Sequence, residues 1–250
     1  MLPDFCLRLA LGLLGCLLLL SPTQSARPAP GTRPLVSANF FRTMFLVALG
    51  LCVGALLWLW PDVPTPLLVC LVSASALTLA GSVTWSLERS PGGVGLIVVS
   101  VGVLIAACYL RDPASLVGGL SAAALLGVAT GSMLLGHNYL ITPTMSMTPL
   151  YRLLGALAIA LVLRAALDGF ALLRWTSGHS MANLNGDLLL WLPVRWLVGI
   201  VAPALLCWMA WQTARIRSTQ SATGILYVVV VFCFLGELTA QLLRGADLTF

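Results

Sequence analysis

Long, uninterrupted runs of apolar residues dominate this sequence and exclude most folds. Each run has about 17 to 25 residues, the length with which an α-helix crosses the hydrocarbon core of a bilayer. The alternating apolar and polar pattern of a membrane β-barrel is absent from these runs. Because backbone polar groups must find partners inside the bilayer, we expect each run to form a helix. The eight expected spans cover about residues 2–20, 43–60, 67–87, 92–110, 116–140, 150–173, 188–211 and 224–243.

The composition supports a membrane protein and excludes an ordinary soluble domain. Of the 250 residues, 60% are hydrophobic and only 8% are charged, and the mean hydropathy is +1.02. The segments between the expected spans are too short to fold as a separate soluble domain. We therefore predict an all-α, polytopic helical membrane protein, with about eight transmembrane helices that form one bundle over residues 1–250.

The arginines predict how the chain is oriented in the membrane. All thirteen positive charges are arginines, and ten of them lie in or beside the loops between the expected spans. Seven of these ten fall on one side of the bundle, and cytoplasmic loops carry such an excess. We therefore expect 21–44 and 212–223 in the cytoplasm and both termini outside, in a bacterial inner membrane. The net charge of +5 then follows from topology, and we expect no nucleic-acid partner.

The first apolar run has a second interpretation. Leu9 to Leu20, followed by small and polar residues, is also typical of a secretory signal peptide. Cleavage there would place Arg27, Arg33 and Arg42 outside, against the charge bias of the later loops. We therefore favour a first span that is retained in the membrane.

Among the charged residues that fall inside the expected spans, we single out Arg164, Asp168, Arg195 and Glu237. A formal charge at hydrocarbon depth costs roughly 3 kcal/mol or more, so such residues pair inside a bundle and often mark function. Residues four apart share a helix face, so Arg164 and Asp168 are neighbours. We expect Asp168, Arg195 and Glu237 to lie five or six residues from the outer ends of their spans. We predict that Arg195 pairs with Glu237, Asp168 or both.

These four residues are the candidate binding site, or a candidate path for protons or ions. One structural alternative is an ion-pair cluster that only holds the last three helices together. Another is that the arginines extend their charged ends to the membrane interface. Pro203 lies within the seventh span, where it should interrupt the helix and free a carbonyl group. Such a kink in the seventh span favours the functional interpretation.

A second polar site is formed by His137, Asn138 and Tyr139 at the inner end of the fifth span. A histidine here could ligate haem or copper, contact a quinone or carry a proton, or serve only a structural role. Haem held by two histidines would need His179, which we expect on the opposite side of the membrane. Haem or quinone is therefore expected only through a partner subunit or an interface.

The sequence contains no motif that predicts an autonomous enzyme. Nucleotide-binding, zinc-protease and serine-hydrolase motifs are absent, and no pair of the seven cysteines has CxxC spacing. We therefore assign no catalytic residue and no metal site, and we do not expect an enzyme in the isolated chain.

Small residues recur every fourth position in two of the expected spans. This spacing allows two helices to approach closely, and we expect it to serve packing inside the bundle. The residues are Gly50 and Gly54 in the second span, and Gly119, Ala123, Gly127 and Gly131 in the fifth.

Three classes of function remain open. The first is a membrane subunit or accessory of a respiratory or other electron-transfer complex, whose intramembrane charged residues handle protons, quinone or an anionic group. The second is a secondary transporter or channel for a small solute. The third is a membrane-embedded assembly or scaffold protein without chemistry of its own. We expect the first, with the lipid bilayer and other membrane protein subunits as partners.

Overall fold

The structure is a computed structural model that describes residues 1–21, 36–87, 92–142, 145–178 and 186–244. Within these ranges the chain is helical and contains no strand, which confirms the expected all-α class. The elements are α1 (Leu2–Leu20), α3 (Ala38–Leu59), α4 (Thr65–Ser86), α5 (Gly93–Arg111), η1 (Pro113–Ser115), α6 (Leu116–Ile141), α7 (Thr148–Gly178), α8 (Gly186–Trp196), η3 (Leu197–Val201), α9 (Ala202–Arg215) and α10 (Thr219–Arg244).

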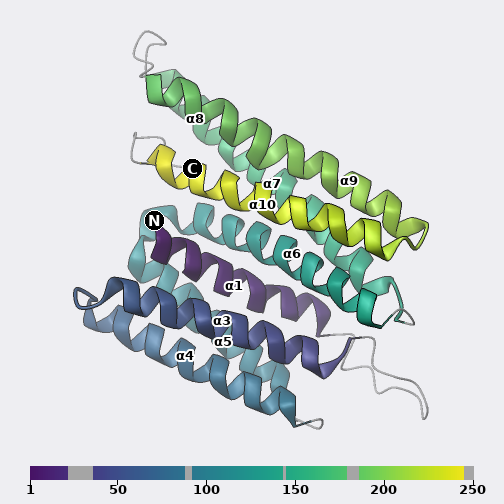
Figure 1. The fold of residues 1–250 in the computed structure, drawn as a ribbon. Coiled ribbons are helices and arrows are strands. Elements are labelled where there is room, and N and C mark those ends of the chain that lie inside the picture. The colour runs from purple at the N-terminus through teal and green to yellow at the C-terminus, as the bar shows by residue number, and fades with distance from the viewer. Residues whose placement is uncertain (22–35, 88–91, 143–144, 179–185, 245–250) are drawn as a thin grey trace.

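In the described part of the chain, eight helical segments are long and apolar enough to cross a membrane. One of them, Leu190–Arg215, combines α8, η3 and α9. Consecutive spans run in opposite directions, so the N-terminal end of α1 and the C-terminal end of α10 lie on the same side of the bundle (Figure 1). The protein is therefore a polytopic integral membrane protein. Which side faces the cytoplasm remains a prediction from the arginines.

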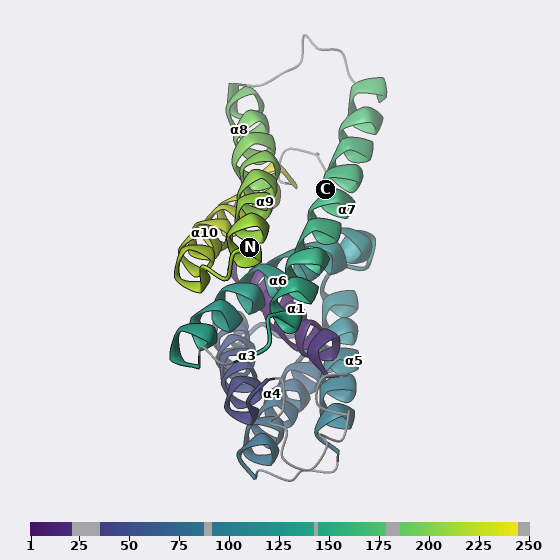
Figure 2. The same cartoon turned by 90° about the vertical axis from the view of Figure 1, so that its right-hand side faces the viewer.

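The helix α7 extends further than the hydropathy pattern predicts. It ends at Gly178, and together with α8 it reaches beyond the other helices (Figure 2). The segment from Arg174 to Ser177 contains no glycine or proline that would end the helix earlier. Asp168 therefore lies ten residues before the end of α7 (168 to 178), and the expected distance of five or six residues is wrong.

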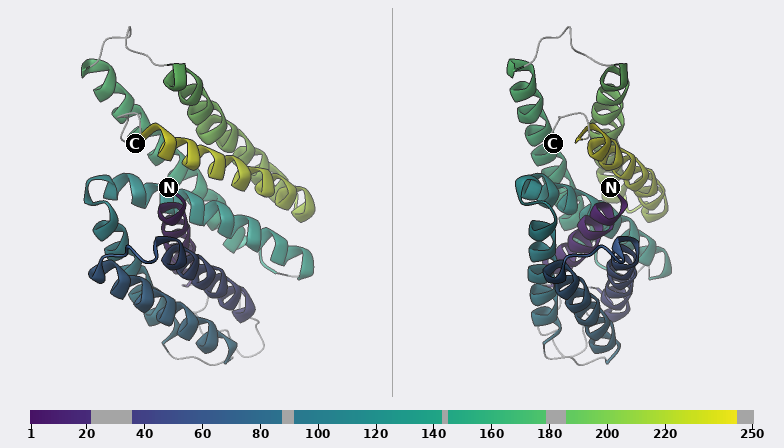
Figure 3. Two further views of the ribbon diagram at one scale, coloured as in Figure 1. Left: turned by 60° about the vertical axis from the view of Figure 1, so that its left-hand side comes forward. Right: turned by 90° about the vertical axis from the view of Figure 1, so that its left-hand side faces the viewer.

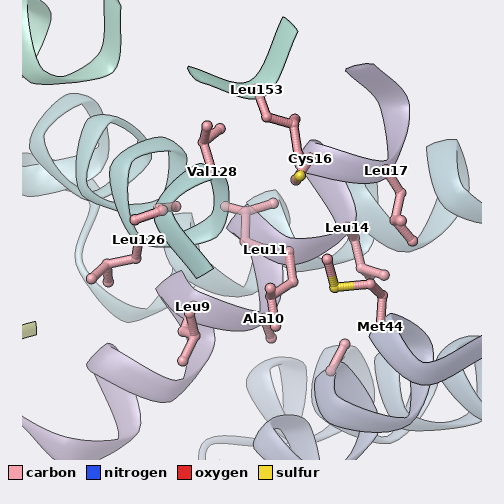
Figure 4. Packing of buried hydrophobic residues seen from close by; sticks show 14 of the residues in the cluster. Leu9, Ala10, Leu11, Leu14, Cys16, Leu17, Met44, Leu126, Val128 and Leu153 are labelled. Carbon is pink, nitrogen blue, oxygen red and sulfur yellow. The ribbon is translucent and has the colours of Figure 1, made fainter. Parts of the chain in front are cut away.

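The first helix occupies the interior of the bundle. It packs between α6 and α3, as both views in Figure 3 show, and most of its residues are buried. Its apolar side chains meet those of three neighbouring helices, including Met44 of α3, Leu126 of α6 and Leu153 of α7 (Figure 4). The helix α1 is therefore part of the core.

Glycines set the distance between α1 and α6. A Cβ atom added at Gly12 would lie 1.8 Å from the carbonyl oxygen of Ala123, and one at Gly127 would lie 1.9 Å from the carbonyl carbon of Gly12. Backbone contact therefore requires glycine, and the predicted internal packing of the small residues in α6 is confirmed there.

The prediction of internal packing is wrong for Gly50 and Gly54 of α3. An added Cβ atom at either would have no neighbour within 4 Å among the described residues, because these glycines lie on the outward face of α3.

The span that contains Arg195 is interrupted, as Pro203 predicts. The π-helical turn η3 follows α8 directly, and Pro203 lies at the start of α9. Proline lacks the N–H group that would continue the hydrogen-bond ladder, and a π-turn accommodates this loss. The irregular turn begins two residues after Arg195 and therefore belongs to the surroundings of the candidate site.

Candidate functional site

Five charged side chains meet inside the bundle, near the helix ends where both termini lie. None of these residues is, as a whole, more than 5% exposed. They are Arg8 of α1, Arg164 and Asp168 of α7, Arg195 of α8 and Glu237 of α10, and we call them the charged cluster. The four residues that the sequence singles out are all in it, brought together from three helices.

Asp168 lies between two guanidinium groups. Nε of Arg195 donates to Oδ2 of Asp168 at 2.8 Å, and Nη2 of Arg195 donates to the same oxygen. Nε of Arg164, one turn earlier on α7, lies 3.4 Å from Oδ1 of Asp168. The predicted pairing of Arg195 with Asp168 is confirmed. Across the described residues, no ion pair joins Arg195 to Glu237.

Glu237 is held by two other arginines. Nη1 of Arg8 donates to Oε1 of Glu237, and Nη2 of Arg164 donates to Oε2 at 3.2 Å. Nε2 of Gln241, one turn further along α10, also donates to Oε1 at 3.4 Å. Arg164 thus contacts both carboxylates and joins the two halves of the charged cluster.

The helix α6 contributes neutral groups to the charged cluster. Nη1 of Arg164 donates to the carbonyl oxygen of Gly118 at 2.9 Å and to Oγ of Ser121 at 3.0 Å. A buried arginine needs acceptors for several of its N–H groups, since unsatisfied donors are costly inside a protein. These two acceptors fix the guanidinium of Arg164 against α6.

Arg8 belongs to the charged cluster but was not predicted as a site residue. The signal was present, because Arg8 is a formal charge inside the first apolar run, like the four residues that were identified. Its position near the start of that run is also where a signal peptide carries its positive charge. The structure instead places Arg8 in the interior, with its side chain 6% exposed and in contact with the last helix.

The charged cluster carries one excess positive charge. It holds three arginines and two carboxylates, and the described residues include no third buried acidic side chain. Three of its buried atoms, Nε of Arg164, Oδ1 of Asp168 and Nη1 of Arg195, form no hydrogen bond in the described chain, although the first two lie 3.4 Å apart as an ion pair. Removing charges from water costs several kcal/mol per ion. The attraction between the ions offsets this cost only when every charge is paired and hydrogen-bonded. The pairing here is incomplete, and the imbalance favours a bound anion.

Two glycines make room for Arg195. A Cβ atom added at Gly236 of α10 would lie 2.4 Å from the Cα atom of Gly199 in η3, so the two backbones touch. The same added atom would lie 3.1 Å from Nη1 of Arg195. The guanidinium of Arg195 therefore fits beside the contact between η3 and α10 because neither glycine carries a side chain.

A polar cavity of about 310 Å³ adjoins the charged cluster. It lies between α1, α5, α10 and the first turn of α6. Arg8 forms part of its wall, and its other charged lining residues are Asp4, Arg111, Asp112 and Arg244. We call it the arginine cavity, and through Arg8 it connects with the buried Glu237.

Ion pairs hold the rim of the arginine cavity. Nε of Arg111 donates to Oδ1 of Asp4 at 2.8 Å. Nη1 of Arg244 donates to Oγ of Ser115 at 3.1 Å and lies 3.5 Å from Oδ2 of Asp112. These contacts position both rim arginines in the cavity wall.

Asp112 caps the short helix η1 in the loop between α5 and α6. Its carboxylate accepts a hydrogen bond from the hydroxyl of Ser115, and the backbone N–H of Ser115 donates to Oδ1 at 3.4 Å. The hydroxyl hydrogen bond lowers the pKa of Asp112 below its usual value. Partial burial opposes this effect, while the backbone hydrogen bond and the nearby Arg244 strengthen it.

The second polar site lies at the other end of α6, and Tyr139 does not line the cavity that His137 and Asn138 share. Tyr139 is fully buried and its hydroxyl donates to the carbonyl oxygen of Ser146. Nδ2 of Asn138 lies 3.7 Å from the sulfur of Met145. The side chain of His137 is exposed, although it lines a separate cavity of about 410 Å³. The hydrogen bond of Tyr139 therefore holds Ser146 against the end of α6.

Two further expectations from the sequence concern His179 and metal ligands. His179 lies outside the described residues, so the expectation that it is separated from His137 remains a prediction. Among the residues that the structure describes, no three His, Cys, Asp or Glu side chains are grouped to hold a metal ion.

The fold and the charged cluster define a polytopic helical membrane protein with a buried, arginine-rich ionic centre. No protein-family model, no curated protein and no solved structure matches this chain.

Proposed function

We propose that this integral membrane protein binds an anionic group at the charged cluster, as a subunit or accessory of a larger membrane complex such as a respiratory or electron-transfer complex. The observation that carries the proposal is the excess of one arginine over the carboxylates in the cluster. Arginine remains protonated in proteins, so this charge cannot be removed by titration. An anion that reaches the cluster would complete its pairing.

Geometry supports anion binding better than a proton path. A proton path needs titratable groups that continue from one side of the membrane to the other. In the described chain the buried carboxylates, Asp168 and Glu237, lie towards one end of the bundle. The interior beyond them is built from apolar side chains such as Leu126, Met44 and Leu153 (Figure 4). Among the described residues, no buried Asp, Glu or His side chain continues a proton path through that part.

The outward face of α3 supports membership in a complex. Gly50 and Gly54 form a shallow surface on the lipid-facing side of this helix, where a partner helix can approach closely. Purification from native membranes, with an absorption spectrum and identification of the proteins that accompany the chain, tests this part of the proposal. A redox chromophore in the partner would support an electron-transfer complex, whereas recovery of the chain alone would contradict it.

Anion binding is tested with the purified protein in nanodiscs of phosphatidylcholine. The thermal midpoint is measured with chloride, acetate or inorganic phosphate at constant ionic strength. A ligand that binds only the folded state raises this midpoint, and we expect at least one anion to do so. Arg8→Gln should abolish the shift, whereas Arg215→Gln, at an exposed position at the other end of the bundle, should retain it. The same shift in both variants, or none in the wild type, would refute anion binding at the cluster.

The same protein in liposomes separates a binding subunit from a transporter. If the anion that raises the thermal midpoint also crosses the vesicle membrane in an Arg8-dependent manner, the chain is a transporter. Binding without flux supports the proposed function.

A further inference from the structure

We propose that the arginine cavity binds a phosphate group, carried either by free phosphate or by a lipid headgroup, between Arg8, Arg111 and Arg244. This inference rests on the proposed function and names the chemical class of its anion. It places the ligand outside the ion pairs of Asp168 and Glu237, where it need not displace either carboxylate.

The orientation of Arg8 supports a ligand in the arginine cavity. Its Nη1 atom is occupied by Glu237. Its Nε and Nη2 atoms have no hydrogen-bond partner among the described residues, although the side chain is 6% exposed and borders the cavity. These two nitrogens form the edge of the guanidinium that binds an oxyanion through two parallel hydrogen bonds. The buried Arg8 thus directs two adjacent N–H donors, on Nε and Nη2, towards the cavity.

Gly119 leaves this donor edge accessible. A Cβ atom added at Gly119 would lie 3.5 Å from Nε and 3.8 Å from Nη2 of Arg8. Both distances are ordinary contacts, so a longer side chain at this position would extend over the edge of the guanidinium. The glycine in the first turns of α6 therefore keeps space for a ligand beside Arg8.

The surroundings of the arginine cavity favour an anion. Among the described residues, five arginines and four carboxylates lie in the charged cluster and around the cavity, so arginines outnumber carboxylates by one there. Leu116 and Gly119 of the cavity wall belong to the beginning of α6, a helix of 26 residues. The N-terminal end of a long helix adds partial positive charge and favours phosphate there.

Phosphate fits the arrangement of donors better than a carboxylate does. The three arginines come from α1, α5 and α10 and reach the cavity from different directions. A phosphate group has several oxygens in a tetrahedral arrangement and accepts from all of these directions, whereas the two oxygens of a carboxylate lie in one plane. The volume of about 310 Å³ also exceeds what a halide ion needs and falls at the lower end of small-molecule sites.

Two probes separate the two sources of phosphate. Inorganic phosphate is titrated into the detergent-purified protein by calorimetry, and phosphatidic acid is compared with phosphatidylcholine by native mass spectrometry. Binding of inorganic phosphate alone assigns the site to free phosphate, and binding of phosphatidic acid alone assigns it to a lipid headgroup. Both results support a phosphate site.

The decisive variant is Gly119→Leu, because it fills the cavity and leaves every charge in place. We expect it to weaken phosphate binding roughly tenfold or more, which corresponds to about 1.4 kcal/mol. Its matched control is Gly224→Leu on α10, where an added Cβ atom has no neighbour within 4 Å. Arg111→Gln is the second variant. It changes a rim residue whose side chain is 37% exposed, so the fold should survive and phosphate binding should still weaken.

The outcomes distinguish this inference from the proposed function. If chloride or acetate stabilises the protein through Arg8 and neither phosphate probe binds, the phosphate site is wrong and the proposed function stands. If no anion binds, both are wrong. Unchanged phosphate affinity in Gly119→Leu and Arg111→Gln would place the anion elsewhere and overturn the inference.

Discussion

Arg8 and Glu237 form a buried ion pair that joins the first membrane-spanning helix to the last. Nη1 of Arg8 donates to Oε1 of Glu237, and both side chains are almost entirely excluded from solvent. The pair spans 229 positions in the sequence, so the charged cluster is complete only when α1 has packed beside α10. Loss of α1 would leave Glu237 with fewer positive partners and would open the core against α6.

We therefore predict that the first helix is retained in the mature protein. Intact-mass measurement of the protein purified from membranes should give a chain that includes residues 1–21. A mature chain that begins after the first apolar run would show that this run is a cleaved signal peptide, and the charged cluster would then lack Arg8.

Arg195→Ala should destabilise the protein by roughly 3–5 kcal/mol, because it leaves Asp168 buried beside a single arginine. The double change Arg195→Met with Asp168→Leu should recover much of this loss, since it removes both charges of the pair. Thermal unfolding in detergent measures the effect, with the exposed Arg174→Ala as the control. Equal midpoints for Arg195→Ala and Arg174→Ala would exclude a buried pair.

Gly236→Ala should destabilise the protein by roughly 1–3 kcal/mol, because the added methyl group would collide with the backbone of Gly199. The collision should also displace Arg195, whose Nη1 atom lies 3.1 Å from the position of the added atom. Gly224→Ala on the same helix meets no neighbour and should be tolerated. Comparable stability of the two variants would contradict the close contact of η3 with α10.

Ser115→Ala should change how the protein responds to acid. The pKa of Asp112 is lowered in the folded state, so its carboxylate contributes stability above the unfolded pKa, and this contribution is lost as the pH falls through the folded pKa. Removing the hydroxyl of Ser115 raises the folded pKa towards its usual value, and the loss should then begin at a higher pH. Thermal midpoints measured across the acidic range test this, with Ser221→Ala as the control. Identical acid profiles for Ser115→Ala and the wild type would refute it.

The spans and most of the charged cluster are predictable from the sequence for one physical reason. Long apolar runs form helices in lipid, and a charged side chain inside such a run must face the interior of the bundle. That reasoning identifies Arg164, Asp168, Arg195 and Glu237, and it applies equally to Arg8. Arg8 was missed because a positive charge near the beginning of a chain also has an interpretation in protein export.

The pairing inside the cluster is not predictable in the same way. Among the described residues Arg195 pairs with Asp168 and not with Glu237, because the rotation of each helix about its axis is set by packing. Spacing is equally ambiguous for glycines. Gly127 touches the backbone of Gly12, whereas Gly50 and Gly54 share the same four-residue spacing and face outward. The arrangement of neighbouring helices decides whether such a glycine contacts another backbone or faces outward.

An anion bound against Arg8 is the central feature that we propose for this protein. An experimental structure of the protein in nanodiscs, prepared in phosphate, tests this directly. We predict density within hydrogen-bonding distance of Nε and Nη2 of Arg8, between Arg111 and Arg244, and a guanidinium that still contacts Glu237. An empty cavity, or Arg8 turned away from it towards a carboxylate of this chain or of a partner, would contradict the account.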